Sequence, residues 1–298
     1  MSERAKKVRS FALVALIGVL ALPALRAETY LVSSTFAGDT RYAVQKLFDG
    51  NDDDLCWAAT ASNLIQNWQD RWLQNGGTIP AGTPNGMVTQ IAYSTDVFAT
   101  FVNNWTNAGG ESYIGMQWWY TDSYTYLADS SELKPGATGG AYWIDLGLDK
   151  DEIFSHTDLY NDEMPVEASL FTDWLDDLVG MNYLAALGIF TNAGDAHAIP
   201  VWGYEMVDDT LTGIWISDSD SGVESNFLVD VYWDNSFNGW LLGDAHTSNP
   251  DVTYTGWFVG DMDMFVLPMV PEPSLVALIL GVLVLGRVVL LRRRVRGA

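Results

Sequence analysis

Apolar segments flanked by basic residues stand at both ends of this 298-residue chain, and they confine any folded domain to the residues between them. The first segment combines an N-terminal basic cluster, an apolar run from Phe11 to Leu22, and the small-residue ending Leu25-Arg26-Ala27. This order is typical of a cleaved secretory signal peptide, because the apolar run is too short to span a bilayer easily. A retained signal anchor is the alternative. We therefore expect an exported protein whose signal peptide is residues 1–27.

The second segment runs from Leu275 to Leu291, is apolar except for Arg287, and is followed by four more arginines. At about 1.5 Å per residue, a helix of this length approaches the thickness of a bilayer core. The arginines should stay cytoplasmic, which places everything before Pro271 on the outer side of the membrane. The sequence thus predicts one C-terminal transmembrane helix and agrees with the signal peptide.

The motif Val270-Pro271-Glu272-Pro273-Ser274 lies directly before this apolar segment. The order of Pro-Glu-Pro, apolar helix and basic tail resembles the PEP-CTERM sorting signal of Gram-negative bacteria. The resemblance implies recognition by an exosortase-type sorting enzyme, loss of residues 271–298, and delivery to the cell surface or extracellular matrix. A plain membrane anchor is the alternative.

The intervening residues 28–270 are enough for one domain with its own core. They hold 36 of the 38 acidic residues and only five of the 15 Lys and Arg, so their net charge is near −31. Nucleic acid and anionic membrane surfaces are therefore poor partners. We attribute the charge to a solubility shell. The high content of Trp and Tyr argues against disorder.

Cys56 is the only cysteine, so no internal disulfide can form. In an exported protein a lone thiol is a liability unless it has a use, although a small buried packing residue is the alternative. The acidic run Asp52–Asp54 offers an N-cap, and an apolar stripe at helical spacing follows: Trp57, Ala61, Leu64, Ile65, Trp68 and Trp72. This pattern places Cys56 in the first turn of a helix, where free N–H groups and the helix dipole stabilise a thiolate.

A catalytic thiol needs a base, and of the three histidines His197 has the best context. It opens an extended run that ends at the turn Asp208–Thr210, and a second short strand then leads to Asp218. Residues equidistant from a hairpin turn face each other, so we expect His197 and Asp218 to meet at the open end. We interpret His156 as a surface residue and His246 as part of a loop.

These residues resemble the Mac/IdeS cysteine peptidases of the papain-like clan, which are known for cleaving immunoglobulin G. Two blocks carry the resemblance and cover well under half of the domain: residues 46–63, which read KLFDGNDDDLCWAATASN, and His197-Ala-Ile-Pro-Val-Trp-Gly with Ile216-Ser-Asp-Ser-Asp220. The resemblance implies that Cys56 is the nucleophile, His197 the base and Asp218 the orienting carboxylate. It also implies that Lys46 is a side chain of the oxyanion hole and that Asp220 is a second carboxylate near the site. Trp57 departs from the small residue of the immunoglobulin-cleaving members, and residues 78–163 show no correspondence, so the resemblance does not define the substrate.

The fold class that we expect is α+β: a papain-like single domain with the Cys-bearing helix packed on an antiparallel sheet, plus the C-terminal transmembrane helix. The strands are expected over Tyr183 to Thr191, His197 to Val207, Ile214 to Asp218, Phe227 to Trp233 and Trp257 to Leu267, with a second helix over Val166 to Val179.

The predicted function is that of an exported cysteine endopeptidase, which hydrolyses peptide bonds of a protein substrate through a thioester acyl-enzyme. Two alternatives remain: a non-catalytic surface or matrix-binding protein, and a transglutaminase-type acyl transferase that uses the same triad. The chain has no CxxC, HExxH or Gly-rich phosphate loop, and Asp218–Gly222 only faintly resembles a calcium loop. We therefore expect neither a cofactor nor a metal.

Overall fold

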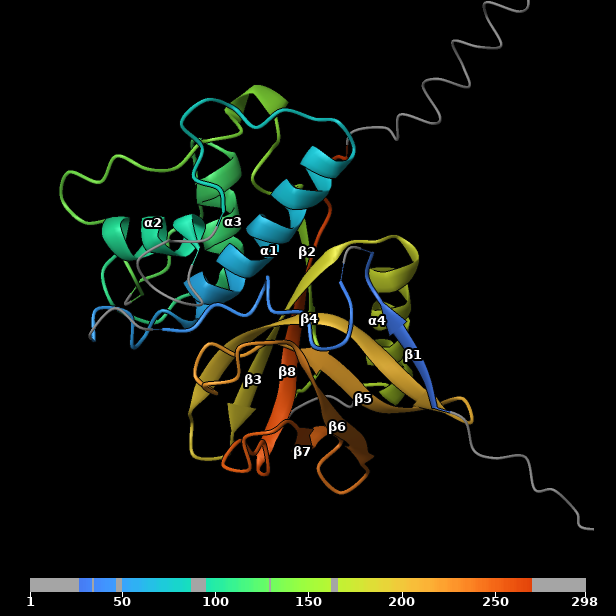
Figure 1. Cartoon of the computed structure of the whole chain (residues 1–298). Helices are drawn as coiled ribbons and strands as arrows, with labels where there is room; N and C mark the ends of the chain where they lie inside the picture. The colour runs from blue at the N-terminus through green and yellow to red at the C-terminus, as the bar shows by residue number, and fades with distance from the viewer. Residues whose placement is uncertain are drawn as a thin grey trace, which may run out of the picture.

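The computed structural model describes residues 27–33, 35–46, 50–86, 95–128, 130–161 and 166–269 (Figure 1). Among these residues, none of the helices has the length and apolar character needed to span a bilayer. The predicted transmembrane helix, the sorting signal and all but the last residue of the predicted signal peptide lie outside the described residues, so they stay predictions.

The described chain folds into eight strands, four α-helices and one short 3₁₀ helix. The strands are β1 (Ala27–Leu31), β2 (Phe154–Asp158), β3 (Leu184–Thr191), β4 (Ala196–Val207), β5 (Thr210–Ile216), β6 (Phe227–Asp234), β7 (Gly239–His246) and β8 (Trp257–Phe265). The helices are α1 (Cys56–Gln74), α2 (Asp96–Asn104), α3 (Ser112–Tyr120) and α4 (Ala168–Gly180), with the 3₁₀ helix η1 at Ile144–Leu146.

Six of the strands form a closed antiparallel barrel in the order β4-β3-β8-β7-β6-β5, because β5 also pairs with β4. The two other strands extend the sheet, β1 on β4 and β2 on β8. The predicted papain-like α+β architecture is therefore wrong. The sequence reading missed β7, which completes the ring between β6 and β8.

Strand β4 explains how the sheet closes. Its first half pairs with β3 and its second half with β1, while its other edge pairs with β5 through two register shifts. Such irregularities bend and twist a strand, as a barrel requires. Gly203 stands where the partner changes, at φ 154°, and a Cβ there would lie 2.0 Å from the carbonyl oxygen of Tyr30. Only glycine fits this close approach.

The turn between β4 and β5 lies where the sequence predicted it. Asp208 and Asp209 both have positive φ, 49° and 60°, as expected for a two-residue turn whose twist matches that of the strands. Small polar residues tolerate this conformation better than most, which makes the pair a local signal for the hairpin.

The helices α1, α2 and α3 gather on one side of the barrel, and α1 lies at the boundary (Figure 1). Helix α1 packs against β4 and β3 on one side and against α2 and α3 on the other, while α4 packs against β4 elsewhere. Helix α1 is consequently buried almost all round rather than along one stripe. Some of its polar residues are paired inside the core: Gln69 Oε1 accepts hydrogen bonds from the indoles of Trp119 (3.3 Å) and Trp143 (3.1 Å).

Candidate functional site

Cys56 is the first residue of α1, which confirms its predicted position in the first helical turn. The acidic run does not cap the helix as we expected, because Leu55 is the N-cap residue and no side chain bonds to the free N–H groups. These N–H groups therefore remain available beside the thiol. Thr60, one turn further on, donates a hydrogen bond of 2.8 Å to the carbonyl of Ala198 and so ties the helix to β4.

His197 lies near the start of β4, and its ring is almost enclosed, with 11% of the side chain exposed. Its Nε2 lies 2.8 Å from Oδ1 of Asp218, whose side chain is 8% exposed. Cys56 and His197 line the same cavity, and each side chain shifts the pKa of the other. Since Nε2 faces Asp218, the other ring nitrogen, Nδ1, is the one left for the thiol. The structure thus brings the three predicted residues together in the order Cys, His, Asp.

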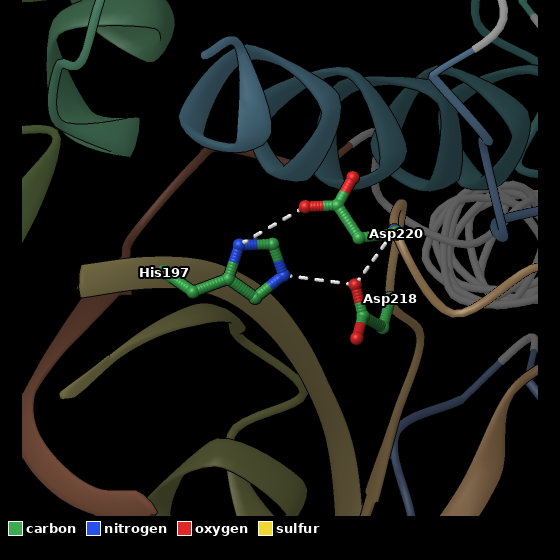
Figure 2. Close-up of side chains that lie close together, drawn as sticks. All are labelled: His197, Asp218 and Asp220. Carbon is green, nitrogen blue, oxygen red and sulfur yellow. Dashed lines mark hydrogen bonds and ion pairs between the residues drawn. The ribbon is translucent and has the colours of Figure 1, made fainter. Parts of the chain in front are cut away.

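The carboxylates of Asp218 and Asp220 lie on different sides of the His197 imidazole. Figure 2 shows each ring nitrogen of His197 directed at its own carboxylate, with Asp218 Oδ1 2.8 Å from Nε2 and Asp220 Oδ2 3.7 Å from Nδ1. Had the β4–β5 ladder continued from the pair Val201–Ile216, His197 would stand opposite Asp220 rather than Asp218. Strand β5 ends at Ile216, and the chain beyond it turns so that Asp218 reaches the ring.

Asp218 is held by three hydrogen-bond donors. Besides His197, the hydroxyl of Tyr254 donates to Oδ2 (2.5 Å) and the backbone N–H of Asp220 donates to Oδ1 (2.8 Å). Burial raises the pKa of Asp218, but these hydrogen bonds and the charge of His197 outweigh it, so the pKa is lowered overall. The carboxylate therefore stays ionised although it is buried. Burial, the charge of Asp218 and this hydrogen bond all raise the pKa of Tyr254, so this side chain remains a donor.

The thiol and the imidazole stabilise each other's charged forms. Burial raises the pKa of Cys56, but the hydrogen bond and charge of His197, the N–H of Ala198 and the charge of Lys46 together lower it below its ordinary value. Burial lowers the pKa of His197, yet its bonds to Asp218 and Cys56 raise it to about 10. Both shifts favour a thiolate–imidazolium pair at neutral pH.

Lys46 is 8% exposed and lies beside Asp220 rather than against a free space. Its Nζ is 2.7 Å from Oδ1 of Asp220 and also bonds to the carbonyl of Asp53. Asp220 is 45% exposed, so it is the outermost member of the group. The structure therefore places Lys46 close enough for its charge to act on the thiol, but with its ammonium already engaged.

Two cavities meet at His197. The larger, about 430 Å³, is lined by Asp218, Asp220, Tyr254 and Trp257 among others. The smaller, about 200 Å³, contains Cys56. Ala196 and His197 line both cavities, so the imidazole stands between them, and only the smaller one is also lined by Cys56.

A metal ion is a second chemical possibility for part of this group. Ligand atoms of His197, Asp218 and Asp220 lie within 4.8 Å of one another. Each of these side chains is already bonded, however: Nε2 of His197 to Asp218, Asp218 to Tyr254 as well, and Asp220 to Lys46. An ion would have to displace these partners, so we do not propose one.

The other histidines lie outside the group. His246 ends β7 rather than lying in a loop, and its Nε2 is 2.7 Å from Asp230. His156 is exposed, as predicted, but lies in β2, where its Nδ1 is 2.8 Å from the buried Asp263. The sequence reading missed Tyr254, because a tyrosine 36 residues from its partner gives no local signal.

Compared with known proteins, the chain matches no family model and no curated protein. The likeness to the Mac/IdeS peptidases therefore rests on the quoted residues alone.

Proposed function

We propose that this protein is a cysteine peptidase that hydrolyses peptide bonds of a protein substrate. One observation supports the proposal: the thiol at the start of α1 shares a cavity with His197, whose Nε2 is bonded to the buried Asp218. A nucleophile, a base and an orienting carboxylate in this order are what acyl transfer requires.

The reaction begins with the thiolate of Cys56, which attacks the substrate carbonyl carbon and forms a tetrahedral adduct. The imidazolium of His197 gives its Nδ1 proton to the leaving amine, the C–N bond breaks, and a thioester remains. The neutral imidazole then takes a proton from water, which attacks the thioester and releases the acid. Asp218 keeps the Nε2 proton in place throughout and stabilises the imidazolium.

The oxyanion of the adduct needs hydrogen-bond donors. The backbone N–H groups of the first turn of α1 are free and lie beside the thiol, and they carry the positive end of the helix dipole. Lys46 contributes its charge, but it has to turn away from Asp220 before it can donate to the oxyanion. Asp220 therefore acts through Lys46 and Nδ1 rather than as a second base.

The decisive experiment combines alkylation with a peptide assay. Purified protein should cleave casein or a mixed peptide library, and iodoacetamide or the substitution Cys56→Ala should abolish cleavage. The substitution His246→Ala is the matched control, because this histidine is also paired with a carboxylate but lines neither cavity. Cleavage that survives Cys56→Ala would refute the proposal.

The same assay separates the two other functions. Incorporation of a labelled primary amine, without net hydrolysis, would indicate the acyl transferase. A folded protein whose thiol reacts no faster than an unstructured cysteine peptide would indicate a non-catalytic surface protein.

We propose further that the enzyme acts outside the cytoplasmic membrane, at the cell surface or in the extracellular matrix of a Gram-negative bacterium. The order of the two terminal segments supports this location. Fractionation of cells that express the tagged full chain tests it, since a cytoplasmic product would contradict it.

A further inference from the structure

The smaller cavity has the size and position of a substrate pocket. Its volume is about 200 Å³, and Cys56 forms part of its lining. Since one water occupies about 30 Å³ in the liquid, the space suits a side chain rather than a single solvent molecule. We call it the Glu111 pocket; its remaining lining residues are Gly109, Gly110, Glu111, Gly188, Phe190, Ala196, His197 and Ala198.

Two glycines of the Glu111 pocket pack closely against neighbouring side chains. A Cβ on Gly110 would lie 2.9 Å from the indole of Trp57, and one on Gly188 would lie 2.5 Å from the carboxylate of Asp261. The indole N–H of Trp57 also donates a hydrogen bond of 3.1 Å to the carbonyl of Ala108. Trp57, next to the nucleophile, therefore fixes the loop that carries Glu111.

The Glu111 pocket carries negative charge that the described residues leave unpaired. No hydrogen-bond donor or cation of the described chain bonds to the Glu111 carboxylate, and Asp261 stands over the wall at Gly188. The surrounding protein and the charges of Asp261 and Asp263 raise the pKa of Glu111 to about 7, although His156 opposes the shift. Burial and Asp263 likewise raise the pKa of Asp261 to about 6. Glu111 is exposed, but it lines the same pocket as Cys56, and Asp261 is half-buried beside Gly188.

We propose that the Glu111 pocket binds a cationic side chain, lysine or arginine, of the substrate close to the scissile bond, and that Glu111 is the residue that selects it. The inference rests on the proposed function and adds the substrate class. A bound cation supplies the partner that the Glu111 carboxylate lacks, and the phenyl ring of Phe190 covers the aliphatic part of the same side chain.

The first test needs no peptidase activity. Methanethiosulfonate reagents transfer an alkylthio group to Cys56: the thiolate attacks the sulfenyl sulfur, a disulfide forms, and methanesulfinate leaves. We compare the rate constants for a trimethylammonioethyl and a sulfonatoethyl reagent on the full-length protein. The cationic reagent should react faster, and Glu111→Gln should lower the ratio of the cationic to the anionic rate constant about fivefold or more.

Two control variants separate the pocket from the general charge of the protein. Glu152→Gln removes an exposed carboxylate that lines neither cavity, and Asp251→Asn removes one from the larger cavity. Both should change the ratio by less than twofold, with circular dichroism confirming the fold of every variant. A ratio that falls as much in either control as in Glu111→Gln would overturn the assignment.

The second test uses peptides that differ only by lysine or glutamine at one position near the cleaved bond. Wild-type protein should prefer lysine at one such position, and Glu111→Gln should remove that preference. If no peptide is cleaved, the proposed function fails, and the assignment of the Glu111 pocket is then tested by the rate constants of the two methanethiosulfonate reagents alone. Preference for lysine that persists in Glu111→Gln would refute the inference.

Discussion

The substitution Asp218→Asn tests the site most directly, because three donors converge on one buried carboxylate. Nε2 of His197 and the N–H of Asp220 lie 2.8 Å from Oδ1, and the hydroxyl of Tyr254 donates to Oδ2. Asparagine keeps the shape but replaces one of the two acceptors by an NH₂ group. Either the hydroxyl of Tyr254 then loses its acceptor, or the imidazole changes tautomer and accepts at Nε2.

In the second case Nε2 of His197 is unprotonated and Nδ1 carries the proton, so Nδ1 can no longer accept the proton of the Cys56 thiol. Neutralising a triad carboxylate in this way lowers turnover by about 10⁴, which corresponds to about 5.4 kcal/mol in the activation barrier. Asp220→Asn should cost about tenfold or less, because its oxygen lies 3.7 Å from Nδ1, on the exposed rim, where the loss resembles that of an outer supporting residue.

The assay is kcat/KM of both variants on one peptide, with circular dichroism and thermal unfolding to show that each is folded. Glu152→Asn serves as the surface control. Equal losses in the two aspartate variants, or a larger loss at Asp220, would refute the reasoning, since the orienting carboxylate would then be the wrong one.

Three further outcomes are expected. Because the pKa of Cys56 is lowered in the folded protein, its thiolate should persist below the usual thiol pKa of about 8.5, and iodoacetamide labelling at pH 6.5 should be at least tenfold faster than for a cysteine peptide. Peptidase activity should fall as the pH rises through about 10, because His197 then loses its positive charge. Tyr254→Phe removes one hydrogen-bond donor from Asp218, so it should lower kcat about tenfold and the free energy of unfolding, measured in urea, by about 1–2 kcal/mol. An unchanged kcat would show that the two remaining donors suffice. Gly203→Ala should destabilise the barrel by about 3 kcal/mol or more, because the methyl group would collide with the backbone at Tyr30, and a change below about 1 kcal/mol in the same urea experiment would contradict the close approach.

The sequence predicted the local parts of the site and missed the distant ones. The position of Cys56 followed from a helical pattern, and the meeting of His197 with Asp218 followed from one hairpin and its turn residues. The expected pairing was nevertheless off by two residues, because the turn is centred between Asp208 and Asp209, one residue beyond Val207, and the two register shifts in β4 cancel. His197 and Asp218 still lie side by side, because the chain beyond β5 turns back toward the imidazole.

The global fold depended on signals that are weak in a single sequence. Closure of the barrel requires Gly203 at the change of partner, β7 between β6 and β8, and the pairing of β3 with the distant β8, and neither alternation nor composition marks a closed ring. Tyr254 and Glu111 reach the site from segments whose position depends on that closure. The sequence could therefore indicate Cys56, His197 and Asp218, but not the residues that support them or line the cavity.

Strand β4 has a further consequence, for how the protein loses its function. It carries His197 and is paired with β3, β1 and β5, so it is the most extensively bonded strand of the barrel. Segments that open readily do so because few bonds hold them, and β4 belongs to the opposite group. The segment from Val201 to Val207, which is paired on both edges, should therefore stay closed until the whole barrel comes apart, and it anchors the strand that carries His197. On heating, the amide protons of this segment should accordingly exchange only as fast as the entire domain unfolds.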